Sequence, residues 1–262
     1  MNYSYNELAK MIDHSLLHPT MTDRELEQGC RDALLYHVAS VCVKPYFVRR
    51  AVELLKGTDI IVGAVVGFPH GGNTTEVKRY ETEVACHEGA KEIDMVINIG
   101  KAISGDWAFV EADVKAVCVE AHKHGAKVKV IFENDFLEAG GAGLTGDDLK
   151  RKLCQICERA GADWVKTSTG YGFVKGPDGK YSYKGATEAD LKLMRANVSE
   201  KVQVKAAGGV RDLDGLIKVK ELGCTRCGAS ATIAMLEDYK RRAKAPPSEA
   251  QQTPGSIGQG GY

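Results

Sequence analysis

The stretch "KVKVIFENDFLEAGGAGLTGDDLKRKLCQICERAGADWVKTS", residues 127–168, contains one complete strand–helix–strand repeat. It begins with an apolar run at 127–134 and ends with a second strand-like run at 163–168. Between them a helical pattern follows the cap-like Thr145-x-x-Asp148. Nearly continuous apolar character is expected of parallel strands that helices cover on both faces. The stretch therefore predicts a β–α–β unit.

The same alternation runs through the first 240 residues. Cap-like signals recur at Thr22-x-x-Glu25, Asn73-x-x-Glu76 and Thr187-x-x-Asp190. Eight strand–helix units predict an α/β protein with a single-domain (β/α)₈ TIM barrel. A doubly wound open sheet is the alternative, which the eight-fold count and the lack of G-x-G-x-x-G after the first strand disfavour. The expected strands are residues 11–15, 38–43, 60–66, 91–98, 127–134, 163–168, 202–207 and 225–229.

Composition narrows the functional class. The chain has 262 residues, with 35 Lys plus Arg and 35 Asp plus Glu, so its net charge is zero. This balance argues against nucleic acid or an anionic membrane as the main partner. The N-terminus shows no basic region followed by an apolar run, and the longest apolar run, residues 60–68, is too short to span a bilayer. We expect a cytoplasmic protein.

Eight cysteines include two C-x-x-C pairs, Cys154/Cys157 and Cys224/Cys227, which on paper could bind zinc. The first pair falls on or near the apolar face of the helix that Leu149 and Leu153 also occupy, and the second lies in a short strand. Neither is on a turn-rich knuckle, so we expect buried cysteines that pack as small hydrophobic residues, and no metal or cofactor. A zinc-dependent binding or redox module remains the alternative from a different functional class.

The last residues, 241–262, differ from the rest of the chain. They are rich in Pro, Gly, Ser and Gln and lack apolar periodicity. We expect residues 1–240 to form the barrel and residues 241–262 to form a flexible tail.

Charged residues interrupt four of the expected strands. Asp94 lies in the fourth strand, Lys129 and Glu133 lie on one face of the fifth, Lys166 is in the sixth and Lys205 is in the seventh. A satisfied internal ion pair explains any one of them. Together, however, adjacent strands bring a carboxylate and several amines to one end of a barrel, which is where barrel enzymes place catalytic groups.

These residue types suit amine chemistry. A lysine must be neutral to attack a carbonyl, and roughly one in 2,500 is neutral at pH 7 if its pKa is near 10.4. Partial burial and the charge of Lys205 would lower the pKa of Lys166, and Asp94 could exchange a proton with Lys205. The pattern predicts Schiff-base chemistry at Lys166.

Glycine turns follow the expected strands six, seven and eight. Loops after strands seven and eight, together with a helix N-terminus, commonly bind phosphate in this kind of barrel. Glycine lets backbone N–H groups approach phosphate oxygens closely. The candidate phosphate-binding residues are Gly170, Gly208, Gly209, Arg211, Gly228 and Ser230.

The motifs "IDHSLL", "EIDMVINIG…SGD", "VKTSTG", "VKAAGGVRD" and "RCGAS", in this order over about residues 8–240, resemble deoxyribose-phosphate aldolases, a family of class I aldolases. The resemblance implies reversible cleavage of 2-deoxy-D-ribose 5-phosphate into acetaldehyde and D-glyceraldehyde 3-phosphate without a metal. It implies Lys166 as the Schiff-base nucleophile, Lys205 as the pKa-perturbing proton donor or acceptor and Asp94 as the acid/base partner. It also places Asp13 and Thr167 among the substrate-binding residues.

Some positions depart from the family pattern. Tyr171 stands where some members have a lysine, Ala231 replaces a serine, and Asn134 replaces a common threonine. Residues 175–185 resemble an insertion near the phosphate end. Some aldolases of this type end in tyrosine, which implies proton delivery to the enamine by Tyr262. The expected partners are a phosphorylated sugar and short aldehydes, with a homodimer as a candidate assembly. The enzyme alternative is a transaldolase-like or keto-acid aldolase.

Overall fold

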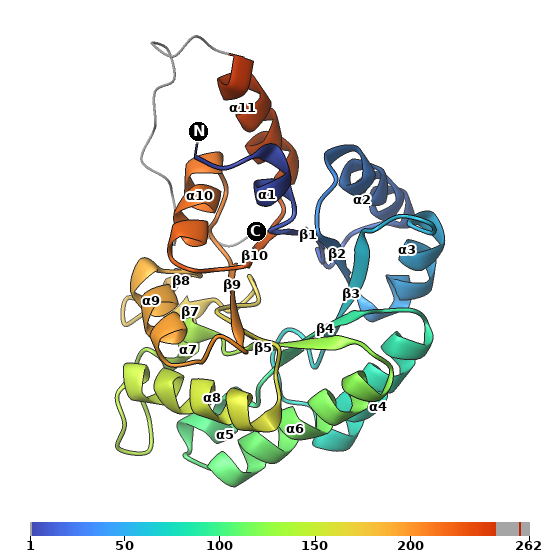
Figure 1. Ribbon diagram of the computed structural model, residues 1–262. Coiled ribbons are helices and arrows are strands. Elements are labelled where there is room, and N and C mark those ends of the chain that lie inside the picture. The colour runs from blue at the N-terminus through green and yellow to red at the C-terminus, as the bar shows by residue number, and fades with distance from the viewer. Residues whose placement is uncertain (1, 245–256, 258–262) are drawn as a thin grey trace.

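The computed structural model describes residues 2–244 and 257. Eight parallel strands close a barrel in the order β1-β10-β9-β6-β5-β4-β3-β2, and helices surround it (Figure 1). This confirms the predicted TIM barrel, with strand ends that differ from the expected ranges by up to three residues. The barrel strands are β1 Ile12–Leu16, β2 Ser40–Val43, β3 Ile61–Val66, β4 Glu92–Val96, β5 Lys127–Ile131, β6 Trp164–Lys166, β9 Gln203–Ala207 and β10 Arg226–Ala229.

Side-chain caps start the helices where the sequence indicated. Thr22, Thr145 and Thr187 each accept a hydrogen bond from a backbone N–H three residues on. At α4 the cap is Thr74, one residue later than expected. The helices are α1 Tyr5–Ala9, α2 Asp23–Tyr36, η1 Pro45–Phe47, α3 Val48–Leu54, α4 Thr75–His87, α5 Ile99–Ile103, α6 Trp107–Lys123, α7 Asn134–Leu137, α8 Gly146–Ala160, α9 Glu188–Ala196, α10 Leu213–Glu221 and α11 Thr232–Lys244.

The expected insertion after β6 forms a small hairpin. Strands β7 (Val174–Lys175) and β8 (Tyr181–Ser182) pair antiparallel, outside the barrel sheet. The carboxylate of Asp135 accepts hydrogen bonds from the backbone N–H groups of Lys184 and Gly185, at 2.7 and 2.9 Å. These bonds fasten the end of the hairpin to helix α7 (Asn134–Leu137), which follows β5.

The C-terminal region departs from the expected boundary. Helix α11 continues to Lys244, so residues 241–244 of the expected tail are helical. Arg242 forms ion pairs with Asp214 and Asp238, which help to stabilise the last turn of α11. Ile257 is partly buried and packs against the hydrophobic core. Tyr262 lies outside the described residues.

Side chains alternate across the barrel wall. On β4, Ile93 and Met95 belong to the hydrophobic core, whereas Asp94 between them makes ion pairs. On β5, Val128 and Val130 flank Lys129 in the same way. Because successive residues of a strand point to opposite faces, the aliphatic layer packs against the helices and the charges point into the barrel.

The eight cysteines are all buried and free. Both C-x-x-C pairs belong to the hydrophobic core, as expected. The described part of the chain contains no group of three or more His, Cys, Asp or Glu residues placed to hold a metal ion. Within that same part, no helix combines the length and apolar character needed to cross a membrane.

Candidate active site

Asp94 holds the two lysines that the sequence singled out. Its Oδ2 atom lies 2.7 Å from Nζ of Lys166 and 2.7 Å from Nζ of Lys205. All three side chains are buried, with relative exposures of 0%, 3% and 1% respectively. The register explains this arrangement, because Lys166 on β6 and Lys205 on β9 are Cα partners in adjacent strands. Asp94 reaches both from β4 across the barrel interior.

Four further charged residues extend this site. Lys129 contacts Asp94 Oδ1 and Asp13 Oδ2, each at 3.1 Å, and makes a short contact with Glu92. Arg226 bridges Asp13 and Glu92 at 2.6 and 2.8 Å. We call these seven residues the ion cluster: Asp13, Glu92, Asp94, Lys129, Lys166, Lys205 and Arg226.

Burial and charge act differently on the two lysines. Burial lowers the pKa of Lys166 below its ordinary value; Asp94 opposes this change, and the Lys205 ammonium adds to it. Burial alone would lower the pKa of Lys205 too, but Asp13 and Asp94 raise it well above its ordinary value. Burial would raise the pKa of Asp94, yet Lys129, Lys166 and Lys205 hold it well below the usual range. Of the two lysines that share Asp94, Lys166 therefore loses its proton more readily than Lys205.

Glu133 does not share the environment of Lys129, contrary to the expectation of a common strand face. Strand β5 ends at Ile131, and Glu133 adopts a left-handed backbone conformation with φ 58°. Its carboxylate accepts hydrogen bonds from the backbone N–H and the hydroxyl of Thr169. Burial raises the pKa of Glu133 to about 7, although the bonds from Thr169 oppose the change. Glu133 thereby orders the glycine loop after β6.

Asp13 and Thr167, two predicted substrate-binding residues, are bonded to other residues of the barrel. Asp13 is fully buried in the ion cluster, where Ser40, Lys205 and Arg226 surround its carboxylate. Thr167 is fully buried as well, and its hydroxyl donates to the carbonyl of Ala207 at 2.9 Å. Both side chains are thus occupied by bonds between strands.

The predicted phosphate loops lie at the carboxyl ends of β6, β9 and β10. Gly170, Gly208 and Gly209 have φ values of 95°, 85° and 79°, which disfavour any residue with a side chain. Gly228 lies within β10, and Ser230 is exposed just before α11. Because β6, β9 and β10 are adjacent parallel strands, their carboxyl ends lie at the same end of the barrel. The loops that follow them therefore lie close together, beside the lysines. Arg211 is exposed on the loop after β9.

The hairpin end packs directly on the loop after β9. The N–H of Ala186 donates to the carbonyl of Gly208 at 3.0 Å. A Cβ atom added at Gly185 would lie 2.7 Å from the carbonyl carbon of Gly208, and one added at Gly208 would overlap the hydroxyl of Tyr183. The residues at the hairpin end therefore pack against the glycine loop that is a candidate for phosphate binding.

Replacing Gly208 with alanine is expected to destabilise the protein more than replacing Gly179 in the hairpin turn. Both glycines have positive φ, 85° and 78°, so both substitutions share a conformational cost of about 1–2 kcal/mol. Only Gly208→Ala adds overlap with Tyr183, since a Cβ at Gly179 would meet no atom within 4 Å. The overlap should cost roughly a further 1–3 kcal/mol. Equal shifts of the thermal unfolding midpoint would contradict the packing described here.

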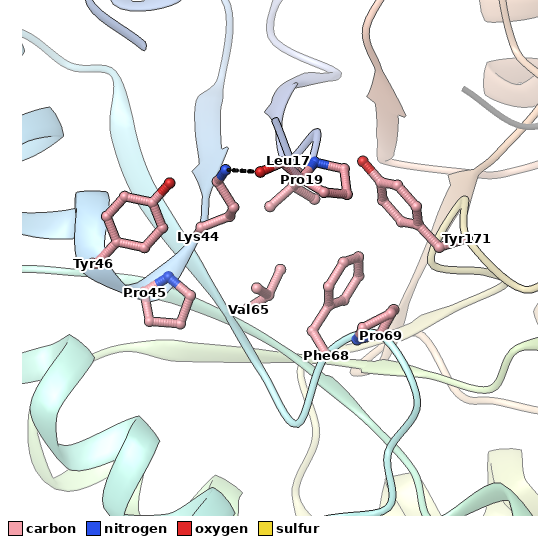
Figure 2. Close-up of a pocket in the computed structure, with 9 residues that line it drawn as sticks. All are labelled: Leu17, Pro19, Lys44, Pro45, Tyr46, Val65, Phe68, Pro69 and Tyr171. Carbon is pink, nitrogen blue, oxygen red and sulfur yellow. Dashed lines mark hydrogen bonds between the residues drawn. The ribbon is translucent and has the colours of Figure 1, made fainter. Parts of the chain in front are cut away.

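A cavity of about 280 Å³ opens near the carboxyl ends of β1, β2 and β3. Figure 2 shows Phe68 and Tyr171 on one side of it and Tyr46 on the other. Val65 in its wall is the register partner of Asp94, which places the cavity beside the ion cluster. This mostly apolar space can receive a small organic molecule next to the lysines.

The sequence interpretation missed Glu92 and Arg226 as members of the site. Both carried the signal that revealed Asp94, because each is a charged residue inside an expected strand of otherwise apolar character. Glu92 also lies two residues before Asp94, the spacing that places two side chains on one face of a strand.

A closed (β/α)₈ barrel that buries two lysines on one carboxylate at the carboxyl ends of its strands belongs to the class of barrel aldolases. The model of the DeoC/LacD family of aldolases matches residues 8–231, and the chain belongs to this family. The deoxyribose-phosphate aldolase of Rhodopirellula baltica is 45% identical over 257 residues, which cover 98% of this chain and 99% of that protein. The deoxyribose-phosphate aldolase of Clostridium perfringens strain 13 is 46% identical over 231 residues, which cover 88% and 95%.

Solved structures agree with this assignment. The deoxyribose phosphate aldolase of Aeropyrum pernix, described as having a unique tetrameric structure, has a TM-score of 0.77 and 28% identity, covering 90% of this chain and 92% of that one. An aldolase designated QR15 has a TM-score of 0.78 and 32% identity, covering 90% and 97%. The resemblance read from the sequence motifs is confirmed.

Proposed function

We propose that this aldolase reversibly cleaves 2-deoxy-D-ribose 5-phosphate into acetaldehyde and D-glyceraldehyde 3-phosphate through a Schiff base on Lys166. One observation carries the proposal. Lys166 is a buried amine that has one carboxylate partner within the described part of the chain, and it shares that partner with a second lysine. Both burial and the second charge favour the neutral, nucleophilic form. The names of the relatives support the choice of substrate.

In the first step the neutral Nζ of Lys166 attacks the C1 carbonyl of the open-chain sugar. The new C–N bond forms, the carbonyl oxygen takes up protons and leaves as water, and an iminium ion remains. Asp94 lies one hydrogen bond from this nitrogen, and Lys205 contacts the same carboxylate oxygen, so a proton can pass between the two amines through it. The low pKa of Asp94 keeps it ionised, so it also stabilises the positive iminium charge.

The iminium ion then drives carbon–carbon cleavage. A base removes the C3 hydroxyl proton, the C2–C3 bond breaks, and its electron pair moves into the iminium to form an enamine. Glyceraldehyde 3-phosphate leaves with carbons 3 to 5. Protonation of the enamine carbon and hydrolysis release acetaldehyde and restore the Lys166 amine. The glycine loops hold the phosphate during these steps, while the apolar cavity beside Val65 provides room for the aldehyde.

A direct assay tests this function. Purified protein should convert 2-deoxyribose 5-phosphate into glyceraldehyde 3-phosphate, measured by a coupled dehydrogenase, and acetaldehyde in equal amounts. Addition of a chelator should leave the rate unchanged, because no step uses a metal. Turnover of a keto acid or a ketose phosphate, with none of deoxyribose 5-phosphate, would favour the keto-acid or transaldolase-like alternative.

Ser230→Asp is expected to raise KM for 2-deoxyribose 5-phosphate by at least about tenfold, with a much smaller effect on unphosphorylated 2-deoxyribose. Ser230 is exposed on the loop before α11, so an aspartate there would place a negative charge against the bound phosphate. Steady-state kinetics on both sugars measures the difference. Equal losses on the two substrates would contradict a phosphate role for this loop.

We also propose that Tyr262 delivers a proton to the enamine carbon. Deleting Tyr262 should slow exchange of the acetaldehyde methyl protons with deuterated water by at least about 10²-fold. Borohydride trapping of acetaldehyde on Lys166 should survive, because added acetaldehyde forms its imine with Lys166 before any enamine is formed or protonated. Exchange as fast as in the full chain would remove Tyr262 from the mechanism.

A further inference from the structure

The cations of the ion cluster have unequal numbers of carboxylate partners. Four cations face three carboxylates through eight ion pairs. Lys129 contacts three carboxylates, while Lys205 and Arg226 contact two each. Among the described residues, Lys166 makes its ion pair with Asp94 alone. With all seven groups ionised, the cluster carries one surplus positive charge.

A surplus charge is costly in a buried site, because little water is present to solvate it. The surplus disappears if one cation loses its proton. The cation with the fewest carboxylate partners does so most easily, and in this cluster that cation is Lys166. The reactivity of Lys166 therefore depends on the charge balance of the whole cluster as well as on its neighbour Lys205.

Lys129 is the cation that connects the cluster. Its Nζ lies 3.1 Å from Asp94 Oδ1, on the opposite carboxylate oxygen from the one that Lys166 and Lys205 share. Its remaining contacts are to Asp13 and Glu92, and its ammonium also faces the ring of Trp164 at 5.6 Å. Lys129 makes no described hydrogen bond to Lys166 and lies one carboxylate away from the reacting nitrogen.

We propose that Lys129 is a positioning residue for the aldol reaction: it supplies the surplus positive charge that keeps Lys166 neutral and holds Asp94 with Oδ2 toward the two lysines. The proposal rests on the proposed Schiff-base function. Its chemistry is electrostatic, so no bond to Lys129 forms or breaks. Lys129 differs in this respect from Lys205, which touches the same Asp94 oxygen as Lys166 and can exchange protons with it.

Several titratable groups face Lys166 and must be separated in any pH measurement. Glu133 lies outside the ion cluster, with its carboxylate on Thr169, and it feels the Lys166 charge. Cys42 is buried, and its thiol also feels the charge of Lys166. Both residues are present in all of the variants below. Among the described residues, the groups to separate, including those one contact further away, are Asp13 on β1, Cys42 on β2, Glu92 and Asp94 on β4, Lys129 on β5, Glu133 after β5, Lys205 on β9 and Arg226 on β10.

The test compares Lys129→Met, Glu92→Gln and the double variant. The measured quantity is the pH at which kcat/KM reaches half its maximum on the acid side, which reports the pKa of the essential amine in the free enzyme. Lys129→Met removes the surplus charge, so the midpoint should rise by about one pH unit or more. Glu92→Gln increases the surplus and should lower the midpoint. The double variant has three cations and two carboxylates, which restores the wild-type surplus of one positive charge. Its midpoint should therefore return toward that of the wild type.

Lys78→Met is the matched control. Lys78 is equally buried, but its ammonium pairs with Asp113 between α4 and α6, outside the ion cluster. It should alter stability without moving the midpoint. A shift in Lys78→Met equal to that in Lys129→Met would overturn the proposal, as would a double variant that behaves like Lys129→Met. If Lys129→Met does not fold, the test uses Glu92→Gln. A midpoint in Glu92→Gln that equals that of the wild type would also overturn the proposal.

Borohydride trapping separates this inference from the proposed function. Acetaldehyde trapped on a residue other than Lys166 in the wild type would remove the basis of the proposed mechanism. Trapping on Lys166 in every variant, combined with unchanged midpoints, would leave the mechanism intact and overturn only the role of Lys129.

Discussion

Replacing Lys166 with methionine is expected to lower kcat for cleavage of 2-deoxyribose 5-phosphate by at least roughly 10⁴-fold, as expected when a covalent nucleophile is lost. The same variant should unfold at the same temperature as the wild type or at a higher one. Methionine fills a similar volume, and Asp94 keeps its ion pairs with Lys129 and Lys205 when the Lys166 amine is removed. Loss of activity with retained stability distinguishes a reactive lysine from a structural one.

The measurement is reduction with borohydride in the presence of acetaldehyde, followed by mass mapping of peptides. In the wild type the adduct should appear on the peptide that contains Lys166 and on no other lysine. Lys127 is a useful internal control, since it begins β5 and is exposed, yet should remain unmodified. Undiminished trapping in Lys166→Met would refute the assignment.

Lys205→Leu is expected to lower kcat by about 10²–10⁴-fold and to raise the pH at half-maximal kcat/KM. The sign follows from the charge of Lys205, which lowers the pKa of Lys166. Without that ammonium, Lys166 keeps its proton to higher pH, and the amine is neutral only in more alkaline solution. A reduced rate with an unchanged pH profile would make Lys205 a proton carrier without an electrostatic role.

The stability of Lys205→Leu should change in the opposite direction from that of Lys166→Met. Lys205 is paired with Asp13 at 2.5 Å and with Asp94 at 2.7 Å, so its loss leaves two buried carboxylates with fewer partners. Breaking such a buried pair typically costs about 3–5 kcal/mol. Thermal unfolding of the two variants side by side would measure this contrast between neighbouring lysines. Equal stabilities would mean that solvent or rearrangement compensates the unpaired carboxylates.

Much of the fold was predictable because its signals are local. The apolar runs and the threonine caps at Thr22, Thr145 and Thr187 mark the strands and helices within a few residues. Asp94, Lys166 and Lys205 were also identifiable, since a charge inside an apolar strand is costly unless it has a partner or a task. The motifs around them were specific enough to indicate the family that the comparisons confirm.

Other features depend on contacts that no local pattern encodes. Closure of the barrel between β1 and β10 brings Asp13 to Arg226, residues at opposite ends of the sequence. This contact makes Asp13, a predicted substrate-binding residue, a member of the ion cluster. The end of β5 at Ile131 and the left-handed conformation of Glu133 separate this carboxylate from Lys129, although their spacing predicted a shared face.

The sequence by itself therefore determined the barrel and its order of strands and helices, and it singled out Lys166 as the candidate reactive amine, because apolar periodicity and the cost of burying charge act residue by residue along the chain. Only the tertiary structure decided how many cations and carboxylates meet around that amine, and which atoms they share. The charge balance is a sum over six strands brought together by barrel closure, and the same closure buries Lys166, which lowers its pKa, beside the opposing charges of Asp94 and Lys205.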